Sequence, residues 1–425
     1  MRFNKETFVA GFALFSMFFG AGNLMLPPLL GLKAGDAWFM VILGFVISAV
    51  LIPLLGIFAH ARLQGTMLDF AKKVSPTFSL IYCILVYMIS IALPSPRTAS
   101  VTHEMAIQPF FGTSAWLTST VYFALVLLFV LNRSKILNLL GKFLSPLIFI
   151  VVLSIICIGI FSIQSPVINP SVFETPIING LLEGYQTFDA IGAVVVGGVI
   201  IVSLKIKGTT DFKQNQGLII KSGIIAGIGL FIIYSGMIYN GALFNNQFDP
   251  NITRTDLLSG LSLKTLGEIG KVFLSILVGL ACFTTAVGIV TGTADFIKGI
   301  CNDSHNTYVI TAVIGCILGV IMGQFDVHYI IDIAIPALMF IYPITIVLIV
   351  LNVLPDRFTS SMVFKTVVIV TIIFSIPDFL ASIGLDTIVT PILETLPLGL
   401  YSLAWLLPSL LALIIMNILL FLKSR

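Results

Sequence analysis

The chain has 425 residues, of which 58% are hydrophobic and 10% are charged, and its formal net charge is +3. A soluble globular domain carries about 25% charged residues, and the mean hydropathy here is +1.11. The composition therefore excludes a soluble globular protein and predicts an integral membrane protein with the lipid bilayer as its solvent.

Apolar runs of about twenty residues, long enough to cross about 30 Å of hydrocarbon as a helix, recur along the whole chain. Twelve such runs predict an all-α polytopic membrane protein with both termini on one side. They cover approximately residues 7–30, 38–58, 77–100, 115–131, 143–163, 180–203, 217–240, 272–296, 307–323, 328–351, 363–383 and 397–421.

The basic residues predict the orientation, because Lys and Arg in short loops are retained on the cytoplasmic side. Seventeen of the 22 Lys and Arg residues fall in the termini and the even-to-odd connections, and five fall in or near the odd-to-even connections. Both termini are therefore expected in the cytoplasm. The first run follows Arg2 and Lys5 but has no small-residue cleavage site before Pro27 and Pro28, so we expect it to remain attached.

Several function classes lack their sequence signals. The charges form no basic face for nucleic acid, and the five cysteines and four histidines are scattered, which favours neither a disulfide framework nor a metal-binding motif. No HExxH motif or Walker-type phosphate loop occurs. We expect no catalysis, no cofactor, no nucleic-acid partner and no obligate protein partner.

The first and sixth spans both contain polar, glycine-rich interruptions, five spans apart. Because five is odd, two five-helix repeats would have opposite orientations in the membrane. We predict one transmembrane domain over residues 1–425, with repeats at 1–163 and 180–352 and two peripheral helices, the eleventh and twelfth, within 360–425.

The first interruption lies in "FFGAGNLMLPPLLG", residues 18–31. A broken helix is tolerated at membrane depth only where protein, ligand or water satisfies the freed backbone groups. The N–H groups after Gly20, Ala21, Gly22 and Asn23 would suit a carboxylate. The alternative is that the glycines only allow close helix packing and the prolines end the span.

The sixth span reads "EGYQTFDAIGAVVVGG" from Glu183. Carbonyl groups at the end of its first half-helix would suit an ammonium group, and Tyr185, Thr187, Phe188 and Asp189 would line the site. An aspartate at membrane depth is by default a functional candidate, but it could equally hold the unwound segment by a hydrogen bond or ion pair. Glu183 is expected nearer the outside, in a structural role.

Two other motifs carry polar side chains within apolar spans. In "LPSPRTASVTHE", Arg97 and Glu104 are seven residues apart, which favours an ion pair near the external mouth over substrate contact. In "ACFTTAVG", Ala281, Thr284 and Thr285 share one helix face. Their oxygens could bind a cation, although such hydroxyls more often bond the carbonyl four residues earlier.

Together, "FSMFFGAGNLMLPPLLGL", "PRTASVTHE", "EGYQTFD" and "CFTTAVG" resemble the bacterial branched-chain amino acid carrier system II family. These are cation symporters for leucine, isoleucine and valine in the cytoplasmic (inner) membrane. The resemblance spans essentially the whole chain. It also implies membership of the amino acid–polyamine–cation superfamily and the LeuT-type fold, in which the first and sixth of ten core helices are unwound at the substrate site.

The resemblance further implies site residues. A sodium ion would lie between the first and eighth spans, bound by the carbonyls of Ser16, Phe19 and Ala281 and the hydroxyls of Thr284 and Thr285. The substrate carboxylate would bind at Gly20, Ala21 and Gly22. The sequence departs from the family pattern at Met25 and Leu26, in place of an isoleucine–phenylalanine pair, and at Gln186, where relatives often carry an apolar residue.

The main hypothesis is thus cation-coupled uptake of branched-chain amino acids by alternating access, with Na⁺ as the expected ion. A proton-coupled carrier of other neutral amino acids would instead use Asp189. A membrane-embedded enzyme would need a nucleophile–base pair or metal ligands, and a channel would need a continuous polar pathway. The sequence favours neither.

Overall fold

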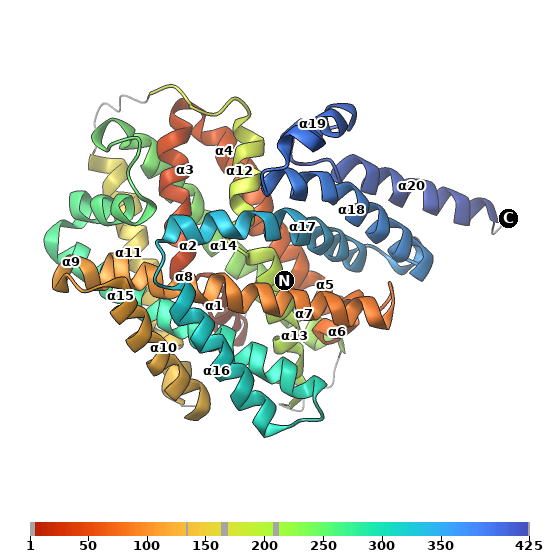
Figure 1. The fold of residues 1–425 in the computed structure, drawn as a ribbon, viewed down its shortest axis with the longest axis horizontal. Helices are drawn as coiled ribbons and strands as arrows, with labels where there is room; N and C mark the ends of the chain where they lie inside the picture. The colour runs from red at the N-terminus through yellow and green to blue at the C-terminus, as the bar shows by residue number, and fades with distance from the viewer. Residues whose placement is uncertain (1–4, 133–134, 163–168, 207–211, 424–425) are drawn as a thin grey trace.

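The computed structural model describes residues 5–132, 135–162, 169–206 and 212–423; within these, the side chains of residues 5–6, 16, 21–22, 135–143, 145, 198–206, 212 and 214 are not described. The regular elements of the described ranges are all helical. They form one bundle, from which the C-terminal helix projects (Figure 1). The predicted all-α fold class is confirmed.

The helices of the first half match the first five predicted spans. Two π-helical turns, Ile47–Leu51 and His103–Ile107, join consecutive helices. The helices are α1 (Lys5–Phe18), α2 (Ala21–Leu24), α3 (Leu26–Ala34), α4 (Trp38–Val46), α5 (Ile52–Leu63), α6 (Met67–Ala71), α7 (Pro76–Ala92), α8 (Pro94–Thr102), α9 (Gln108–Phe111), α10 (Ala115–Asn132) and α11 (Lys135–Ser162).

The second half begins with a second interrupted helix, formed by α12 and α13, and continues with longer helices. They are α12 (Pro176–Tyr185), α13 (Asp189–Ile206), α14 (Phe212–Leu243), α15 (Arg254–Ile300), α16 (His305–Met322), α17 (Val327–Val353), α18 (Ser361–Ser382), α19 (Asp386–Thr395) and α20 (Leu406–Lys423).

Nine helical stretches of the described residues are long and apolar enough to cross a membrane. Because the first and sixth spans are interrupted, α1 has only 14 residues and α12 only 10, which is too short for either to be included among these stretches. The chain is therefore a multi-pass membrane protein, while the count of twelve crossings stays a prediction.

One predicted boundary is wrong, and one predicted connection contains a helix. The α15 element begins at Arg254, inside the segment expected to be a connection, but Gly267, with φ of 71° and ψ of −171°, kinks the chain between this first part and the predicted eighth span. The last span begins at Leu406 rather than near residue 397, because Leu398 and Ser402 have positive φ angles of 63° and 55° that a continuous helix cannot accommodate.

Glycines allow the first broken helix to pack closely on α14. A Cβ atom at Gly31 of α3 would lie 1.8 Å from the carbonyl oxygen of Ile238. In return, a Cβ atom at Gly241 of α14 would lie 2.0 Å from the carbonyl oxygen of Pro28. Both distances are far below a normal carbon–oxygen contact, so only glycine fits at either position.

The second broken helix packs on α4 in the same way. A Cβ atom at Gly44 of α4 would lie 1.8 Å from the carbonyl oxygen of Ile177, and one at Gly180 of α12 would lie 2.3 Å from that of Val41. Helices α1 and α3 both contact α14, whereas α12 contacts α4 and α13 contacts α5. The first span thus packs on the seventh and the sixth on the second, which is the exchange of partners expected of two inverted repeats.

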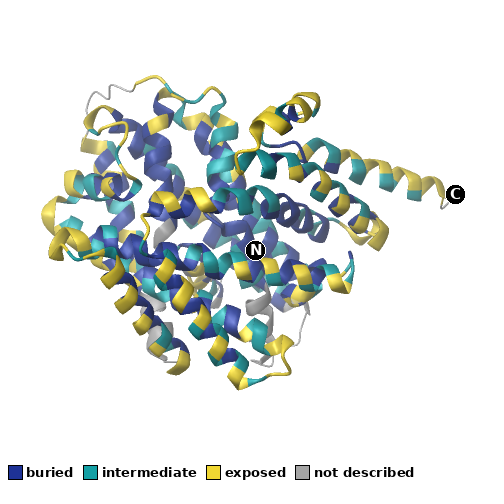
Figure 2. Cartoon of the chain, viewed as in Figure 1, coloured by how far each residue is buried: buried dark blue, intermediate teal, exposed yellow. Residues whose placement is uncertain are grey.

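The C-terminal helices lie at the edge of the bundle. Helix α18 packs on α17, and α20 packs on α18. Most of α20 is exposed (Figure 2), including Leu410, Leu411, Ile414 and Ile418. A row of exposed aliphatic side chains on a helix with internally satisfied backbone groups suits contact with lipid.

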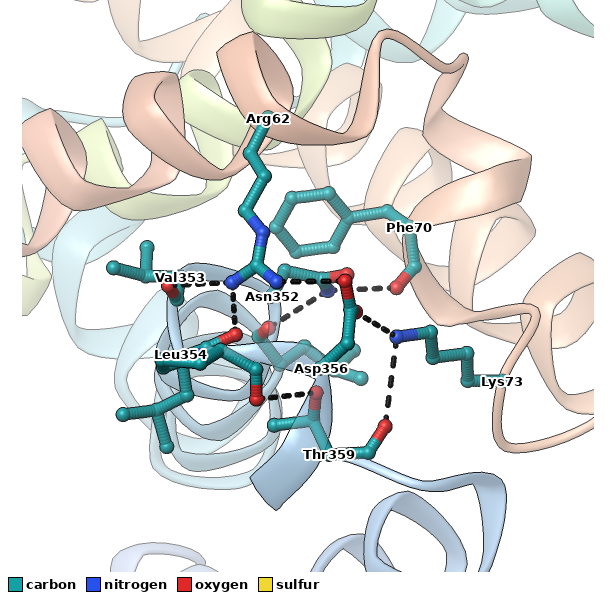
Figure 3. A network of polar contacts seen from close by, with 10 residues as sticks. Arg62, Phe70, Lys73, Asn352, Val353, Leu354, Asp356 and Thr359 are labelled. Carbon is teal, nitrogen blue, oxygen red and sulfur yellow. Dashed lines mark hydrogen bonds and ion pairs between the residues drawn. The ribbon is translucent and has the colours of Figure 1, made fainter.

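A polar network joins two connections that the charge pattern places on the cytoplasmic side (Figure 3). Arg62 and Lys73 both pair with Asp356, at 2.8 and 3.1 Å, and Arg62 also donates to the carbonyls of Val353 and Leu354. Hydrogen bonds from Lys73 and Arg62 lower the pKa of Asp356 below its ordinary value of 3.8. The connections after α5 and α17 therefore share one face, as the predicted topology requires.

Three connections expected on the other side also meet. The amide of Asp36 donates to the carbonyl of Asn169 at 3.0 Å, and that of Val172 donates to the carbonyl of Lys33 at 3.1 Å. The amide of Asn169 donates to Asn245 Oδ1 at 3.4 Å. The connections before α4, α12 and α15 therefore gather over one end of the bundle.

Candidate functional site

The first helix is interrupted where the sequence predicts it. Helix α1 ends at Phe18, and Gly20 has an extended conformation, with φ of −77° and ψ of 145°, before α2 begins at Ala21. The amide of Gly20 donates a hydrogen bond to the carbonyl of Phe18 at 2.8 Å. The structure describes only the backbone at Ser16, Ala21 and Gly22, and the roles predicted for their backbone carbonyl and amide groups stay predictions.

The sixth helix is interrupted between Tyr185, which ends α12, and Asp189, which begins α13. Phe188 has a positive φ of 61°, a conformation that is strained for a bulky side chain and that concentrates at functional sites. The Thr187 hydroxyl donates to the Gly184 carbonyl at 2.8 Å and accepts the Asp189 amide at 3.2 Å. The side chain of Thr187 thus replaces part of the missing helix ladder.

A direct hydrogen bond joins the two interruptions. Asn23 Nδ2 donates to Asp189 Oδ1 at 2.8 Å, and the Tyr234 hydroxyl of α14 donates to Asp189 Oδ2 at 3.0 Å. Asp189 is 3% exposed. The aspartate therefore holds segments from α2, α13 and α14 together, which is one of the two roles that the sequence left open for it.

Arg97 of α8 also points at this junction. Its guanidinium donates to the Gln186 carbonyl at 2.9 Å and to Asn23 Oδ1 at 3.4 Å. The guanidinium carbon lies 5.5 Å from the centre of the Phe188 ring, within the range of a cation–π contact. A buried arginine thus contacts both interrupted segments.

The predicted pairing of Arg97 with Glu104 is wrong. The π-helical turn His103–Ile107 follows α8, and the wider turn changes the spacing at which side chains share a face. Glu104 instead accepts the Thr255 hydroxyl at 2.6 Å and the Val327 amide at 2.9 Å. It therefore links the end of the third span to the N-terminal ends of α15 and α17.

A second charged cluster lies beside the sixth-span interruption. Arg254, at the start of α15, pairs with Glu183 Oε1 at 2.8 Å and donates to Gln186 Oε1 at 3.0 Å. Gln186 Nε2 donates to Glu183 Oε2 at 2.9 Å. The Gln186 side chain therefore belongs to this cluster, which agrees with the structural role expected of Glu183.

Sequence reasoning missed three residues of this region. Arg254 gives no signal in the sequence beyond its positive charge in a predicted connection. Tyr234 and Tyr342 give no signal among the many aromatic residues of apolar spans. Tyr342 stacks on Tyr185 with ring centres 4.4 Å apart and accepts the Ala190 amide at 3.3 Å.

The predicted cation ligands of the eighth span lie next to the first interruption. A Cβ atom at Gly20 would be 3.7 Å from Thr285 Oγ1, and Phe19 is buried beside it. Thr284 and Thr285 both donate to the Ala281 carbonyl, at 3.0 and 2.9 Å. Each hydroxyl keeps acceptor lone pairs while it donates, so the geometry accommodates either the helix-bonded role or cation binding.

Solved structures share this architecture. The chain resembles the inward-facing conformation of Mhp1 with a TM-score of 0.62 at 11% identity, over 98% of this chain and 91% of that one. It resembles a Na⁺-coupled sialic acid symporter with a TM-score of 0.61 at 15% identity over 97% and 90%. For MhsT in complex with L-phenylalanine the TM-score is 0.54 at 16% identity, over 98% of both chains. The chain therefore has the LeuT-type fold, with its two helix interruptions facing each other.

Sequence comparison identifies the family. The model of the branched-chain amino acid transport protein family matches residues 3–423. The branched-chain amino acid permease BraB of Bacillus subtilis is 33% identical over 422 residues, covering 97% of this chain and 94% of that protein. The branched-chain amino acid transport system 2 carrier protein of Pseudomonas aeruginosa is 31% identical over 412 residues, covering 95% and 94%. The chain belongs to this family, whose members are transporters and not enzymes.

Proposed function

We propose that this protein imports leucine, isoleucine and valine across the bacterial cytoplasmic membrane by symport with Na⁺. The observation that carries the proposal is the Asn23–Asp189 contact, which brings two helix interruptions together at a buried polar site in a chain of the branched-chain amino acid transport family. Both termini lie in the cytoplasm in this scheme, on the side of the Arg62–Asp356 pair.

A zwitterionic amino acid suits the two interruptions. The amides of Ala21 and Gly22 begin the α2–α3 segment directly after Gly20, and they attract a carboxylate through the positive end of the helix dipole. The carbonyl end of α12 and the carboxylate of Asp189 attract the ammonium group. The aliphatic side chain then needs only an apolar surface, and nearby Phe19 and Phe188 are both buried.

The coupling ion would bind where the first interruption meets α15. Carbonyl and hydroxyl oxygens of Phe19, Ala281, Thr284 and Thr285, together with the Ser16 carbonyl, make an all-oxygen ligand set suited to an alkali cation. One Na⁺ entering down about 100 mV supplies about 2.3 kcal/mol. That is about fifty-fold accumulation of substrate before any sodium gradient is added.

Uptake of radiolabelled leucine into proteoliposomes tests this function. An inward sodium gradient at constant pH should drive accumulation above equilibrium, and an inward proton gradient without sodium should not. Accumulation driven by protons alone would move the coupling role to Asp189, which is 3% exposed. Failure of either gradient to drive leucine, isoleucine or valine would refute symport of these substrates.

A further inference from the structure

Two buried opposite charges lie at the junction of the interruptions, separated by an uncharged amide. Asn23 Nδ2 donates to Asp189 Oδ1 at 2.8 Å, and Asn23 Oδ1 accepts from Arg97 at 3.4 Å. Arg97 is 5% exposed and Asp189 is 3% exposed. The amide of Asn23 therefore presents its positive end to the aspartate and its negative end to the arginine.

Among the residues that the structure describes, the arginine has no charged partner in direct contact. Its two acceptors, the Gln186 carbonyl and Asn23 Oδ1, are both neutral, although a guanidinium has five N–H donors. The bond to Asn23 is long for an N–H···O contact. Buried charges within membrane segments normally pair with opposite charges, so Arg97 is positioned to accept a stronger anionic partner than it has here.

We infer that Arg97 binds the carboxylate of the amino acid substrate. Until the substrate binds, the Asn23 amide occupies the substrate's position between the two charges. The inference rests on the proposed function and adds to it a residue, a recognition mode and a sequence of contacts. A free α-amino acid carries an anionic and a cationic group on one carbon. It can replace both ends of the Asn23 amide, with its carboxylate on Arg97 and its ammonium group on Asp189.

The replacement also links binding to movement. The Asn23–Asp189 bond is a direct connection between α2 and α13, and Arg97 connects both to α8. A substrate that takes over Arg97 and Asp189 releases Asn23, so that the substrate itself joins the two interrupted helices. A planar, bidentate guanidinium is better suited than an ammonium to hold a carboxylate in such a position.

Calorimetric titration of the purified protein in sodium-containing detergent buffer tests the inference with two probes. Leucine carries both charged groups, and leucinol keeps the ammonium group but has no carboxylate. Arg97→Gln should weaken leucine binding about 10- to 100-fold, the range for a hydrogen bond to a charged group. The same variant should leave the weaker binding of leucinol within roughly threefold of wild type.

Two further variants keep the result unambiguous. Arg97→Lys retains the charge and serves if Arg97→Gln does not fold; it should weaken leucine binding and spare leucinol. Arg254→Gln is the matched control, because Arg254 contacts Glu183 and Gln186 and not Asn23, and it should leave the ratio of the two affinities unchanged.

Equal weakening of leucine and leucinol by the Arg97 variants would show that Arg97 only maintains the fold and would overturn the inference. Unchanged leucine binding would overturn it as well. Wild-type protein that binds no leucine would instead refute the proposed function, so the two failures are distinguishable.

Discussion

Replacement of Gly241 by alanine tests whether backbone contact between α3 and α14 positions the first interruption. The new Cβ atom would lie 2.0 Å from the Pro28 carbonyl oxygen, whereas carbon–oxygen contacts of this kind lie at about 3.3 Å or more. The helices must therefore separate by about 1.3 Å. Both contacting groups are anchored in helices, so no flexible side chain can absorb the change.

Overpacking of this kind costs about 1–3 kcal/mol. Gly241→Ala should therefore lower the midpoint of thermal unfolding in detergent. It should also reduce leucine uptake, because α3 directly follows α2, the segment after Gly20, and displacement of α3 would displace that segment. Gly288→Ala is the matched control: a Cβ atom there meets nothing within 4 Å in the described part of the chain, and alanine in a helix is favoured over glycine by about 0.5–1 kcal/mol. Equal thermal stability of Gly241→Ala and wild type would refute the close-packing argument.

Three other predictions follow from the site and its surroundings. Thr285→Ala should abolish sodium-stimulated leucine uptake in proteoliposomes, and unchanged uptake with unchanged sodium dependence would remove the cation assignment. Asp356→Asn should flatten the loss of thermal stability toward acid pH: the lowered pKa of Asp356 means that its pairing stabilises the protein above the ordinary value and is lost as the pH falls through the lowered one. The effect should be small because the carboxylate is 80% exposed, and identical acid profiles would contradict it. Valine, isoleucine and leucine should inhibit radiolabelled leucine uptake with binding free energies that differ by about 1–3 kcal/mol. Lysine should not inhibit it, because burying its unpaired charge is costly. Strong inhibition by lysine would contradict an apolar pocket.

The long apolar runs predict the fold well because hydrophobic length is a strong, local signal in membranes. Glycine and polar residues inside the first and sixth runs also give the two interruptions, since only such residues make a break tolerable there. Hydrophobic length does not predict the helix Arg254–Leu266 in the connection between the seventh and eighth spans, because this helix is not a membrane span. The apolar run continues through the left-handed residues Leu398 and Ser402, so hydrophobic length alone places the start of the last span too early, although Pro397 and Gly399 are local turn signals.

The site could be predicted only in part. Asn23 and Asp189 stand out because such polar and charged residues are rare in apolar spans, whereas Thr285 is singled out chiefly by the family resemblance. Their partners do not stand out in the sequence. Arg97 contacts Asn23 and Gln186 only because α8 packs beside both interruptions. The π-helical turn His103–Ile107 prevents the ion pair with Glu104 that the seven-residue spacing predicts. Tyr234 and Tyr342 become visible as site neighbours only in the structure, where the Tyr234 hydroxyl bonds Asp189 and the Tyr342 hydroxyl accepts the Ala190 amide.

The most direct test of the account is an experimental structure of the protein determined with leucine and sodium. We predict leucine between Gly20–Asn23 and Gln186–Asp189, with both helices interrupted there and a sodium ion beside Thr285. Leucine bound elsewhere, or a continuous helix through either segment, would contradict the account.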